Sequence, residues 1–345
     1  MTTFDSILGQ GKAIDGLRRA YAADRLPHGL VFAGPEGVGK GTTAAALAAL
    51  FLCERPAGDR PCGQCDSCRV FPSGNHPDYH VVTKELIRYH DKSGTSKGTS
   101  LSINVIRPEV VDKAGRKAVM GRGKVFVIEQ ADLMQAAAQN ALLKTLEEPA
   151  GRTAIVLLTD QPDALLATIR SRTQTFAFVP LPGDVVAREL AARGVSAADA
   201  AAAATLAGGS IGTALKWIAD GVLGPARELA GRVDQLLAGR PVEDLPGWLK
   251  RAADAYAEKQ LERDELASKD QATREGYALY LRVVADRLRA ALARDDDADA
   301  LDRACDAVDA VVRAEQYLDG NVNVSLVLQQ LGMALGSALL VPWRA

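Results

Sequence analysis

A phosphate-binding P-loop is indicated by the stretch GPEGVGK at residues 34–40. It follows a short apolar run, residues 30–32, suited to a buried strand, and precedes an alanine- and leucine-rich segment with high helix propensity. Backbone N–H groups of such a loop form a nest for phosphate, and the helix N-terminus adds partial positive charge. We expect ATP or ADP to bind here, with Lys40 reaching the β- and γ-phosphates. The expected nucleotide-binding residues are Gly34, Pro35, Gly37, Gly39, Lys40, Gly41 and Thr42.

Two residues that a hydrolysing P-loop site uses are replaced in this chain. The P-loop lysine is followed by Gly41, where Ser or Thr usually coordinates Mg²⁺, and Thr42 is rotated from that position by about 100° around the helix. The apolar run 124–128 ends at Glu129, an acidic residue placed to hold Mg²⁺, but Gln130 follows it. Glutamine has no charge and cannot act as a base. We therefore expect Glu129 in a nucleotide site whose capacity for hydrolysis is a separate question.

A closed metal site is indicated by four clustered cysteines. Two consecutive C-x-x-C steps and one cysteine further upstream supply four thiolates, the ligand set of a tetrahedral structural zinc site. The expected zinc ligands are Cys53, Cys62, Cys65 and Cys68. Free buried cysteines and a redox pair are the alternatives, and His76 or His80 could replace a ligand. The fifth cysteine, Cys305, lies in an alanine-rich segment and is expected in a helical core.

Five short apolar runs alternate with helical patterns over the first half of the chain. They lie at residues 30–32, 78–82, 124–128, 153–159 and 174–178. This alternation predicts a parallel five-stranded α/β sheet with helices on both faces. Residues 180–220 contain three helical stretches, and the pattern from 221 onward is helical throughout. The expected domains are 1–179 with the zinc module at 53–68, then 180–220, and an all-α domain at 221–345.

Composition and charge limit the class of protein. The chain has 345 residues, 48% of them hydrophobic, and a net charge of -2, so any contact with nucleic acid must be a local patch. It contains no run of about 18 apolar residues, and its first ten residues do not resemble a signal peptide. We expect a soluble, cytoplasmic protein that makes no membrane contact.

A cluster of basic residues follows a polar, glycine-rich stretch, residues 91–100, that is expected to be a surface loop. An amphipathic helix is expected from residue 103 to about residue 119. The basic residues on and after it are Arg107, Lys113, Arg116, Lys117, Arg122 and Lys124. They form either an ordinary solvated helix face or a patch that faces phosphates.

Several motifs together give the chain a family resemblance. They are the LPH sequence at 26–28, the P-loop, the cysteine module placed after the P-loop helix, NALLKTLEEP at 140–149 and LLATIRSR at 165–172. The chain resembles the delta prime subunits of bacterial DNA polymerase III clamp loaders, which belong to the AAA+ ATPases. The motifs cover about residues 5–218. The C-terminal half matches in length and helical character, with Asn323 near the start of the last helix also in keeping.

The resemblance implies a AAA+ P-loop domain, a small helical lid at 180–220 and a C-terminal collar that holds a hetero-oligomer together. Arg172 in Ser171-Arg172-Thr173 would be an arginine finger that acts in trans on a neighbour's ATP site. The family has Cys where Thr173 stands, and a surface ion pair is the alternative role for Arg172. In the lid, Gly212 replaces an arginine that contacts the γ-phosphate in motor subunits.

The implied function is a structural and regulatory clamp-loader subunit in DNA replication, with little or no intrinsic ATPase activity. Its implied partners are the tau/gamma and delta subunits, the sliding clamp, and primed DNA in the assembled complex. Intact Lys40 and Glu129 keep open the alternative of an active motor of the tau/gamma type. The run at residues 39–42 also resembles the P-loop of adenylate kinases, so a small-molecule phosphotransferase is a further alternative.

Overall fold

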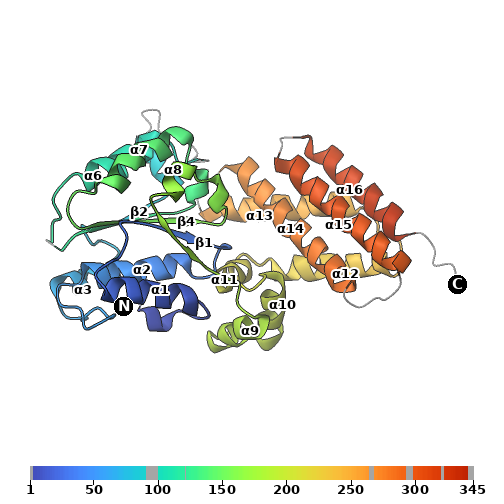
Figure 1. Cartoon of the computed structure of the whole chain (residues 1–345). Coiled ribbons are helices and arrows are strands. Elements are labelled where there is room, and N and C mark those ends of the chain that lie inside the picture. Colours follow the sequence, from blue (N-terminus) through green and yellow to red (C-terminus); the bar gives the residue numbers. More distant parts are fainter. Residues whose placement is uncertain are drawn as a thin grey trace. The chain divides into compact units, whose positions relative to one another are not determined.

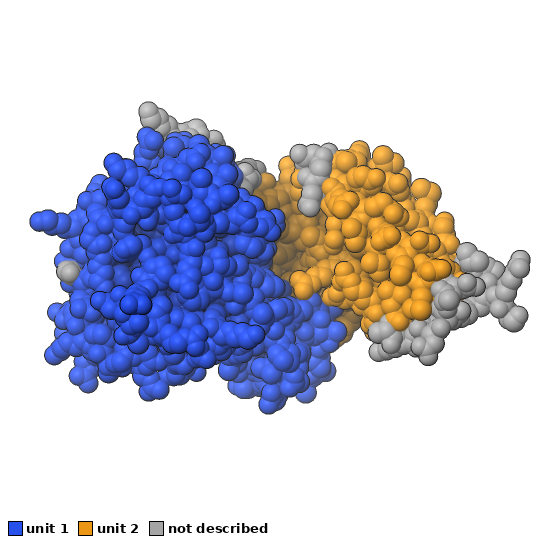
Figure 2. All heavy atoms as spheres, in the orientation of Figure 1, with its two compact units in different colours: residues 1–214 blue, residues 215–345 orange. Residues whose placement is uncertain are grey.

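The chain folds into two units in the computed structural model, residues 1–214 and residues 215–345, which are coloured separately in Figure 2. The structure describes residues 3–90, 100–120, 122–263, 268–292, 298–319 and 322–340. Most of the loop expected at residues 91–100 lies outside these ranges. The predicted boundaries at 179/180 and 220/221 remain predictions, since the division into units falls between them.

The first unit is built on a five-stranded parallel sheet (Figure 1), as the alternating pattern predicts. Its strands, in the spatial order β2-β3-β4-β1-β5, are all joined in parallel. The bounds are β1 Gly29–Ala33, β2 Tyr79–Val82, β3 Lys124–Ile128, β4 Thr153–Thr159 and β5 Gln174–Ala177. Every residue of β1, β3 and β4 is buried, which is why these strands read as continuous apolar runs.

Helices cover both faces of this sheet (Figure 1). On one face, α1 (Gly11–Ala22) and α2 (Lys40–Leu52) pack against Phe32 and the alternate residues of β3 and β4 that share its side. On the other face lie α5 (Ile103–Ile106) and α7 (Ala136–Glu147). The remaining helices of this unit are α3 Asp66–Val70, α4 Ile87–His90, α6 Asp112–Ala114, α8 Ala167–Arg170, α9 Gly183–Ala192 and α10 Ala197–Leu206. Helix α11, Ile211–Ala219, crosses the boundary between the units.

The helix expected at 103–119 is shorter than the prediction. It ends at Ala114 and contains a wider turn, Arg107–Val111, between α5 and α6. The cause is local: Pro108 has no N–H to donate, which favours a departure from regular α-helical bonding. Gly115 then ends the helix, so the basic residues 116–122 lie in an irregular connection before β3.

The second unit is helical throughout its described residues, in agreement with the sequence pattern. Its helices are α12 Leu223–Leu237, α13 Leu245–Arg263, α14 Lys269–Leu292, α15 Ala298–Asp319 and α16 Val324–Leu339. Asn323 caps α16 by accepting a hydrogen bond from the backbone N–H of Leu326. Cys305 on α15 is exposed, so the prediction that it is a core residue is wrong. The buried residues of the same helix, such as Ala304 and Ala307, lie on another side of it.

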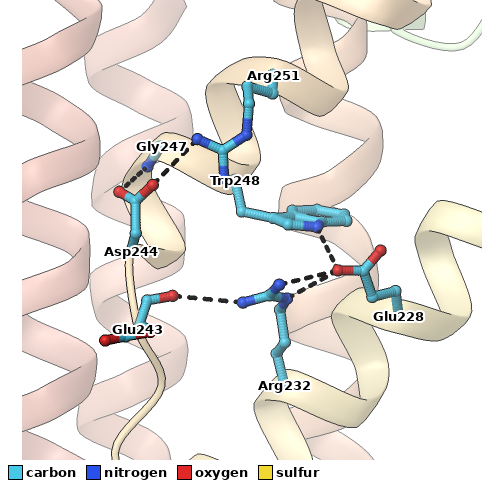
Figure 3. A network of polar contacts seen from close by, with 7 residues as sticks. All are labelled: Glu228, Arg232, Glu243, Asp244, Gly247, Trp248 and Arg251. Atoms are coloured by element: carbon cyan, nitrogen blue, oxygen red, sulfur yellow. Dashed lines mark hydrogen bonds and ion pairs between the residues drawn. The ribbon is translucent and has the colours of Figure 1, made fainter.

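A polar network ties α12 to α13 in this unit (Figure 3). The carboxylate of Glu228 accepts hydrogen bonds from the Arg232 guanidinium and, at 2.7 Å, from the indole N–H of Trp248. Asp244 pairs with Arg251 at 3.0 Å and accepts the backbone N–H of Gly247. The buried indole therefore keeps its hydrogen bond while its ring packs among the helices.

Candidate nucleotide and metal sites

The P-loop connects the carboxyl end of β1 to the start of α2. Gly34, Gly37 and Gly39 have φ angles of 154°, 72° and 106°, which side-chain-bearing residues rarely adopt. A Cβ atom on Gly34 would lie 2.2 Å from the carbonyl oxygen of Phe178, so this glycine is also required by a close approach of the chain. The structure thus has the strand, glycine loop and helix that the sequence predicts.

Lys40, the first residue of α2, is buried at the base of the loop. Its Nζ donates hydrogen bonds to the carbonyl oxygens of Gly34 and, at 2.7 Å, of Pro35. Burial lowers the pKa of Lys40, and the carboxylates of Asp160, Glu36 and Asp132 partly offset that effect. The lysine is therefore held inside the cradle in an environment of negative charge.

Asp160 is a site residue that the sequence interpretation missed. It directly follows β4, the strand that lies beside β1, so its position is next to the P-loop. Burial raises its pKa, and the neighbouring Asp132, whose carboxylate accepts the Thr159 hydroxyl at 2.8 Å, raises it further. An acidic residue at the carboxyl end of a buried strand was the available signal.

Glu129 follows β3, one strand further from β1. The residue is exposed, but the loss of some surrounding water raises the pKa of its carboxyl group, and the nearby Glu85 raises it further. The charges that act on Lys40 are those of Asp160, Glu36 and Asp132. Gln130, the residue after Glu129, is exposed and has a left-handed backbone with φ of 48°.

The position of the missing Mg²⁺-binding hydroxyl has room for one. Gly41 and Thr42 are both exposed on the first turn of α2, and a Cβ atom on Gly41 would meet only Leu158 Cδ1, at 3.9 Å. The next residue, Thr43, is buried, and its hydroxyl donates to the carbonyl oxygen of Gly39 at 2.8 Å. Packing therefore does not require glycine at position 41, and Thr43 uses its hydroxyl inside the helix.

Residues of the predicted lid lie directly on the P-loop within the first unit. The backbone N–H of Gly212 donates to the carbonyl oxygen of Gly37 at 3.0 Å, and the Thr213 hydroxyl donates to that of Glu36 at 3.3 Å. A Cβ atom on Gly212 would lie 2.9 Å from Gly37 Cα and 3.0 Å from its carbonyl oxygen. Both are backbone atoms, so only glycine permits this close contact.

Arg172 lies on the surface just after α8. Its Nε forms an ion pair with Glu147, the last residue of α7, and its Nη1 donates to the carbonyl oxygen of Thr168 at 3.0 Å. The side chain is 37% exposed, and the Thr173 hydroxyl bonds to the carbonyl oxygen of Ile169. The guanidinium is therefore accessible, and one exposed carboxylate holds it.

The four cysteines of the predicted zinc site converge. The sulfurs of Cys53, Cys62, Cys65 and Cys68 all lie within 4.8 Å of one another. Two pairs, Cys53–Cys65 and Cys62–Cys68, are 4.0 Å apart. Tetrahedral zinc with Zn–S bonds of about 2.3 Å requires S–S separations of about 3.8 Å, so the sulfurs fit one ion.

The backbone around the cysteines also suits bound thiolates. Backbone N–H groups of Cys62, Cys65 and Cys68 donate to sulfurs of the set, at 3.2–3.4 Å. The nearby His76 is engaged elsewhere: its ring contacts the Ser67 hydroxyl at 3.0 Å and accepts the backbone N–H of Asp78. The cluster can thus hold a metal ion with four sulfur ligands.

Comparison with known proteins gives the family. The sequence model described as "DNA polymerase III, delta subunit" matches residues 9–182, half of the chain. The chain belongs to this family. The matched region of this delta-family chain contains the P-loop, the cysteine cluster, NALLKTLEEP and Arg172.

Two relatives of this delta-family chain are DNA polymerase III subunits delta prime. The protein of Escherichia coli K12 is 36% identical over 198 residues, which cover 57% of this chain and 56% of the relative. That of Pseudomonas aeruginosa PAO1 is 36% identical over 213 residues, covering 61% of each. The matches thus span little more than half the length of these relatives. Among solved structures, a gamma subunit-related protein of Thermotoga maritima has a TM-score of 0.42 and 16% identity, covering 94% of this chain and 99% of that one.

The fold of the delta-family chain is an α/β P-loop fold, followed by a helical C-terminal region. The parallel five-stranded sheet with its P-loop after β1, and the cysteine module inserted after α2, confirm that part of the prediction. Within the described residues, no helix is long and apolar enough to cross a membrane.

Proposed function

We propose that the chain is a delta prime subunit of a DNA polymerase III clamp loader and acts in DNA replication. The observation that carries this proposal is the match to the family model, which includes the P-loop, the cysteine module and Arg172. The partners follow from that role: the tau/gamma and delta subunits in a hetero-oligomer, the sliding clamp, and primed DNA in the assembled complex. The cytoplasm is the corresponding location.

The subunit is proposed to have little or no ATPase activity of its own. Gly41 lacks the metal-binding hydroxyl, and Gln130 lacks the charge of a base. The third replaced residue is Gly212, which stands where motor subunits have an arginine. It lies so close to Gly37 that no arginine side chain fits without displacing the segment around residue 212. This contact favours the delta prime role over an active tau/gamma motor, because a motor needs an arginine there.

The P-loop residues nevertheless fit a nucleotide. The glycine nest and the backbone N–H groups at the start of α2 would hold the phosphates of ATP or ADP, and Lys40 would turn from the carbonyl oxygens of Gly34 and Pro35 to them. Mg²⁺, when bound with the nucleotide, would neutralise phosphate charge beside Asp132 and Asp160. Bound nucleotide would thus stabilise the domain rather than undergo turnover.

The metal is proposed to be a structural Zn²⁺ held by all four cysteines, which leaves no open position for water. The bound zinc should be measured per chain by mass spectrometry of the native protein. Cys65→Ser should abolish it, whereas Cys305→Ser, which changes an exposed cysteine, should not. Retention of one zinc per chain by Cys65→Ser would contradict the assignment.

Arg172 is proposed as the residue through which this subunit takes part in chemistry. On assembly, its guanidinium would leave Glu147 and stabilise the charge of a phosphoryl group transferred in the neighbour's ATP site. The free energy needed to break this ion pair is small, because Arg172 and its one carboxylate partner are both exposed and such pairs contribute about 1 kcal/mol or less.

The test is a loader reconstituted with tau/gamma and delta subunits, in which ATPase activity on clamp and primed DNA is measured. Arg172→Ala should lower turnover in the neighbouring site by about 10³-fold or more, removing that site's share of the total activity. The matched control is Arg170→Ala, two residues before Arg172. It breaks an exposed ion pair with Asp163 and should leave the activity unchanged. Full ATPase activity of the Arg172→Ala loader would refute the finger.

Assays on the isolated chain distinguish the non-catalytic subunit from an active motor and from a phosphotransferase. Hydrolysis of ATP at the rate of the motor subunits would refute a non-catalytic role, and phosphate transfer to a nucleoside monophosphate would instead indicate a phosphotransferase. Failure of the chain to assemble with tau/gamma and delta subunits would refute the clamp-loader role itself.

A further inference from the structure

A hollow borders the sheet at the edge opposite to the P-loop. It has a volume of about 410 Å³. Its walls come from two connections: the one from α6 into β3, with residues 115–118 and 122–124, and the one into β4, with residues 150–152. These connections precede parallel strands, so the hollow lies at the amino edge of the sheet and is separate from the nucleotide site. We call it the basic pocket.

The lining of the basic pocket is cationic. Five of its ten residues are Arg116, Lys117, Arg122, Lys124 and Arg152, and the other five are glycines and alanines. The whole chain carries a net charge of -2, so this concentration of positive charge is a local feature. Glycine and alanine leave the backbone accessible between the cations, as a small anion requires.

Lys124 forms the floor of the basic pocket and has a structural role. Its buried Nζ donates hydrogen bonds to the carbonyl oxygens of Ala114, Arg116 and, at 2.9 Å, Lys113. These are carbonyl groups at and just after the end of the helix, where regular helical hydrogen bonds stop. The Lys113 carbonyl oxygen also accepts the backbone N–H of Arg116 at 3.2 Å, so Ala114 and Arg116 are the ones that depend on the lysine. The lysine thereby fixes the connection that carries Arg116 and Lys117.

Arg152 is fixed on another wall of the pocket. Its guanidinium lies 3.8 Å from the centre of the Phe51 ring, and its Nη1 donates to the carbonyl oxygens of Phe51 and Arg122. Gly123 allows this packing, because a Cβ atom there would lie 2.4 Å from the Arg152 carbonyl oxygen. Burial lowers the pKa of Arg152, and the charge of Arg122 lowers it further.

The other three cations have no internal partners. Within the described ranges, Arg116, Lys117 and Arg122 form no ion pair, and the buried Nε of Arg122 has no hydrogen-bond acceptor. Lys113, in the same basic stretch, is different: its ammonium pairs with Glu109 at 2.5 Å. A buried guanidinium nitrogen without an acceptor costs free energy unless an acceptor from outside supplies the bond.

We propose that the basic pocket binds a phosphate group, held by Arg122 and Arg152 in the walls and by Arg116 and Lys117 at the rim. Guanidinium groups match the oxygens of phosphate, and hydrogen bonds to charged acceptors are the strongest that such a site can form. The phosphate belongs either to a free anion or to the backbone of a nucleic acid. The pocket differs from the predicted patch at 107–124 in that Lys113 and Lys124 are engaged internally and Arg152 is added.

The test uses the full chain in low-salt buffer with EDTA, where nucleotide binding that depends on Mg²⁺ is suppressed. Inorganic phosphate and pyrophosphate are titrated by calorimetry, and a short labelled oligothymidylate is titrated by fluorescence anisotropy. Arg122→Gln should weaken each ligand that binds by about tenfold or more, the equivalent of one lost charged hydrogen bond. For the oligonucleotide, the dependence of affinity on salt should also become shallower.

The half-buried Arg122 could matter for folding, so Arg116→Gln/Lys117→Gln, which changes two exposed side chains, is the second test variant. Its matched control is Arg240→Gln/Lys250→Gln, which removes the same charges from exposed positions of the second unit. Weakening by Arg116→Gln/Lys117→Gln and not by the control supports the pocket, and which probes bind identifies the source of the phosphate. If none of the three probes binds, or if both pairs of substitutions weaken binding equally, the proposal is wrong.

Phosphate binding in the basic pocket does not depend on the clamp-loader role. Phosphate binding is measured on the isolated chain, whereas the clamp-loader role is tested by assembly with other subunits. Loss of phosphate binding in the variants with normal assembly, or the reverse, would therefore separate the two.

Discussion

The P-loop and the basic pocket of the first unit are alike in construction and opposite in charge. Each is bordered by glycines, and in each a buried lysine donates hydrogen bonds to backbone carbonyl oxygens. Around Lys40 lie the carboxylates of Asp160, Glu36 and Asp132, whereas the basic pocket around Lys124 is lined by arginines and a lysine. The same loop-and-lysine construction therefore suits two ligands: a phosphate that arrives with Mg²⁺ at the P-loop, and a phosphate without metal at the basic pocket.

The largest difference is expected in how much Lys124 and Lys40 each contribute to the stability of the fold. Lys124→Met removes three hydrogen bonds to carbonyl groups near the helix end and leaves those of Ala114 and Arg116 without a partner, so it should lower the free energy of unfolding by about 2–4 kcal/mol. Lys40→Met frees two carbonyl groups of a partly exposed loop, which water can reach, and should cost about 1 kcal/mol or less. Urea denaturation followed by a probe of the first unit measures both. Equal losses would remove the distinction between a structural and a ligand-binding lysine.

A smaller effect is expected where the backbone of Gly212 touches the P-loop. Gly212→Ala places a methyl group against the backbone of Gly37 and should cost about 1–3 kcal/mol or displace the segment around residue 212 from the loop. Gly41→Ala is the matched control: the added methyl group makes only an ordinary contact with Leu158, and the position is helical, so the change should be neutral or slightly stabilising. Hydrogen exchange of the P-loop amides in the two variants tests this. Unchanged protection and stability of Gly212→Ala would show that the contact is loose.

The smallest effect concerns the charge of Asp160 beside the cradle. Its pKa is raised in the folded chain, chiefly by burial, so the ionised form is disfavoured and stability falls as pH rises through the interval above the unfolded pKa of about 3.8. Asp160→Asn should therefore raise stability at pH 7 by no more than a few tenths of a kcal/mol, because the side chain is partly in water. The advantage should vanish below about pH 4, where the carboxyl group is protonated in both states. Thermal unfolding at both pH values gives the comparison, and an advantage that persists at low pH would have another cause.

The sequence was sufficient for the sheet because its central strands are buried on both faces. The runs 124–128 and 153–159 are continuous and apolar, and both strands have the predicted bounds. The cysteine spacing likewise predicted four converging sulfurs, since C-x-x-C steps constrain geometry locally. In the helical second unit, the prediction that Cys305 is a core residue failed because which face of a helix packs depends on its neighbours.

Contacts between distant segments could not be predicted in the same way. No local pattern shows that Gly212 lies against Gly37, or that Lys124 turns from its strand to the end of a helix. The sequence interpretation treated Gly212 only as a missing arginine, and Lys124 only as one of six basic residues. Both have their roles through close packing of chain segments that come together only in the folded unit.

Helix α2 links the features at the two edges of the sheet. It begins at Lys40 in the P-loop, its penultimate residue Phe51 holds Arg152 of the basic pocket, and Cys53 of the metal cluster follows directly. Thirteen helical residues span about 20 Å, and they form one rigid segment. Any shift of this helix that favours nucleotide binding at the P-loop therefore also moves Phe51, which holds Arg152 of the basic pocket. By thermodynamic linkage, the factor by which phosphate in the basic pocket changes nucleotide affinity must equal the factor by which nucleotide changes phosphate affinity.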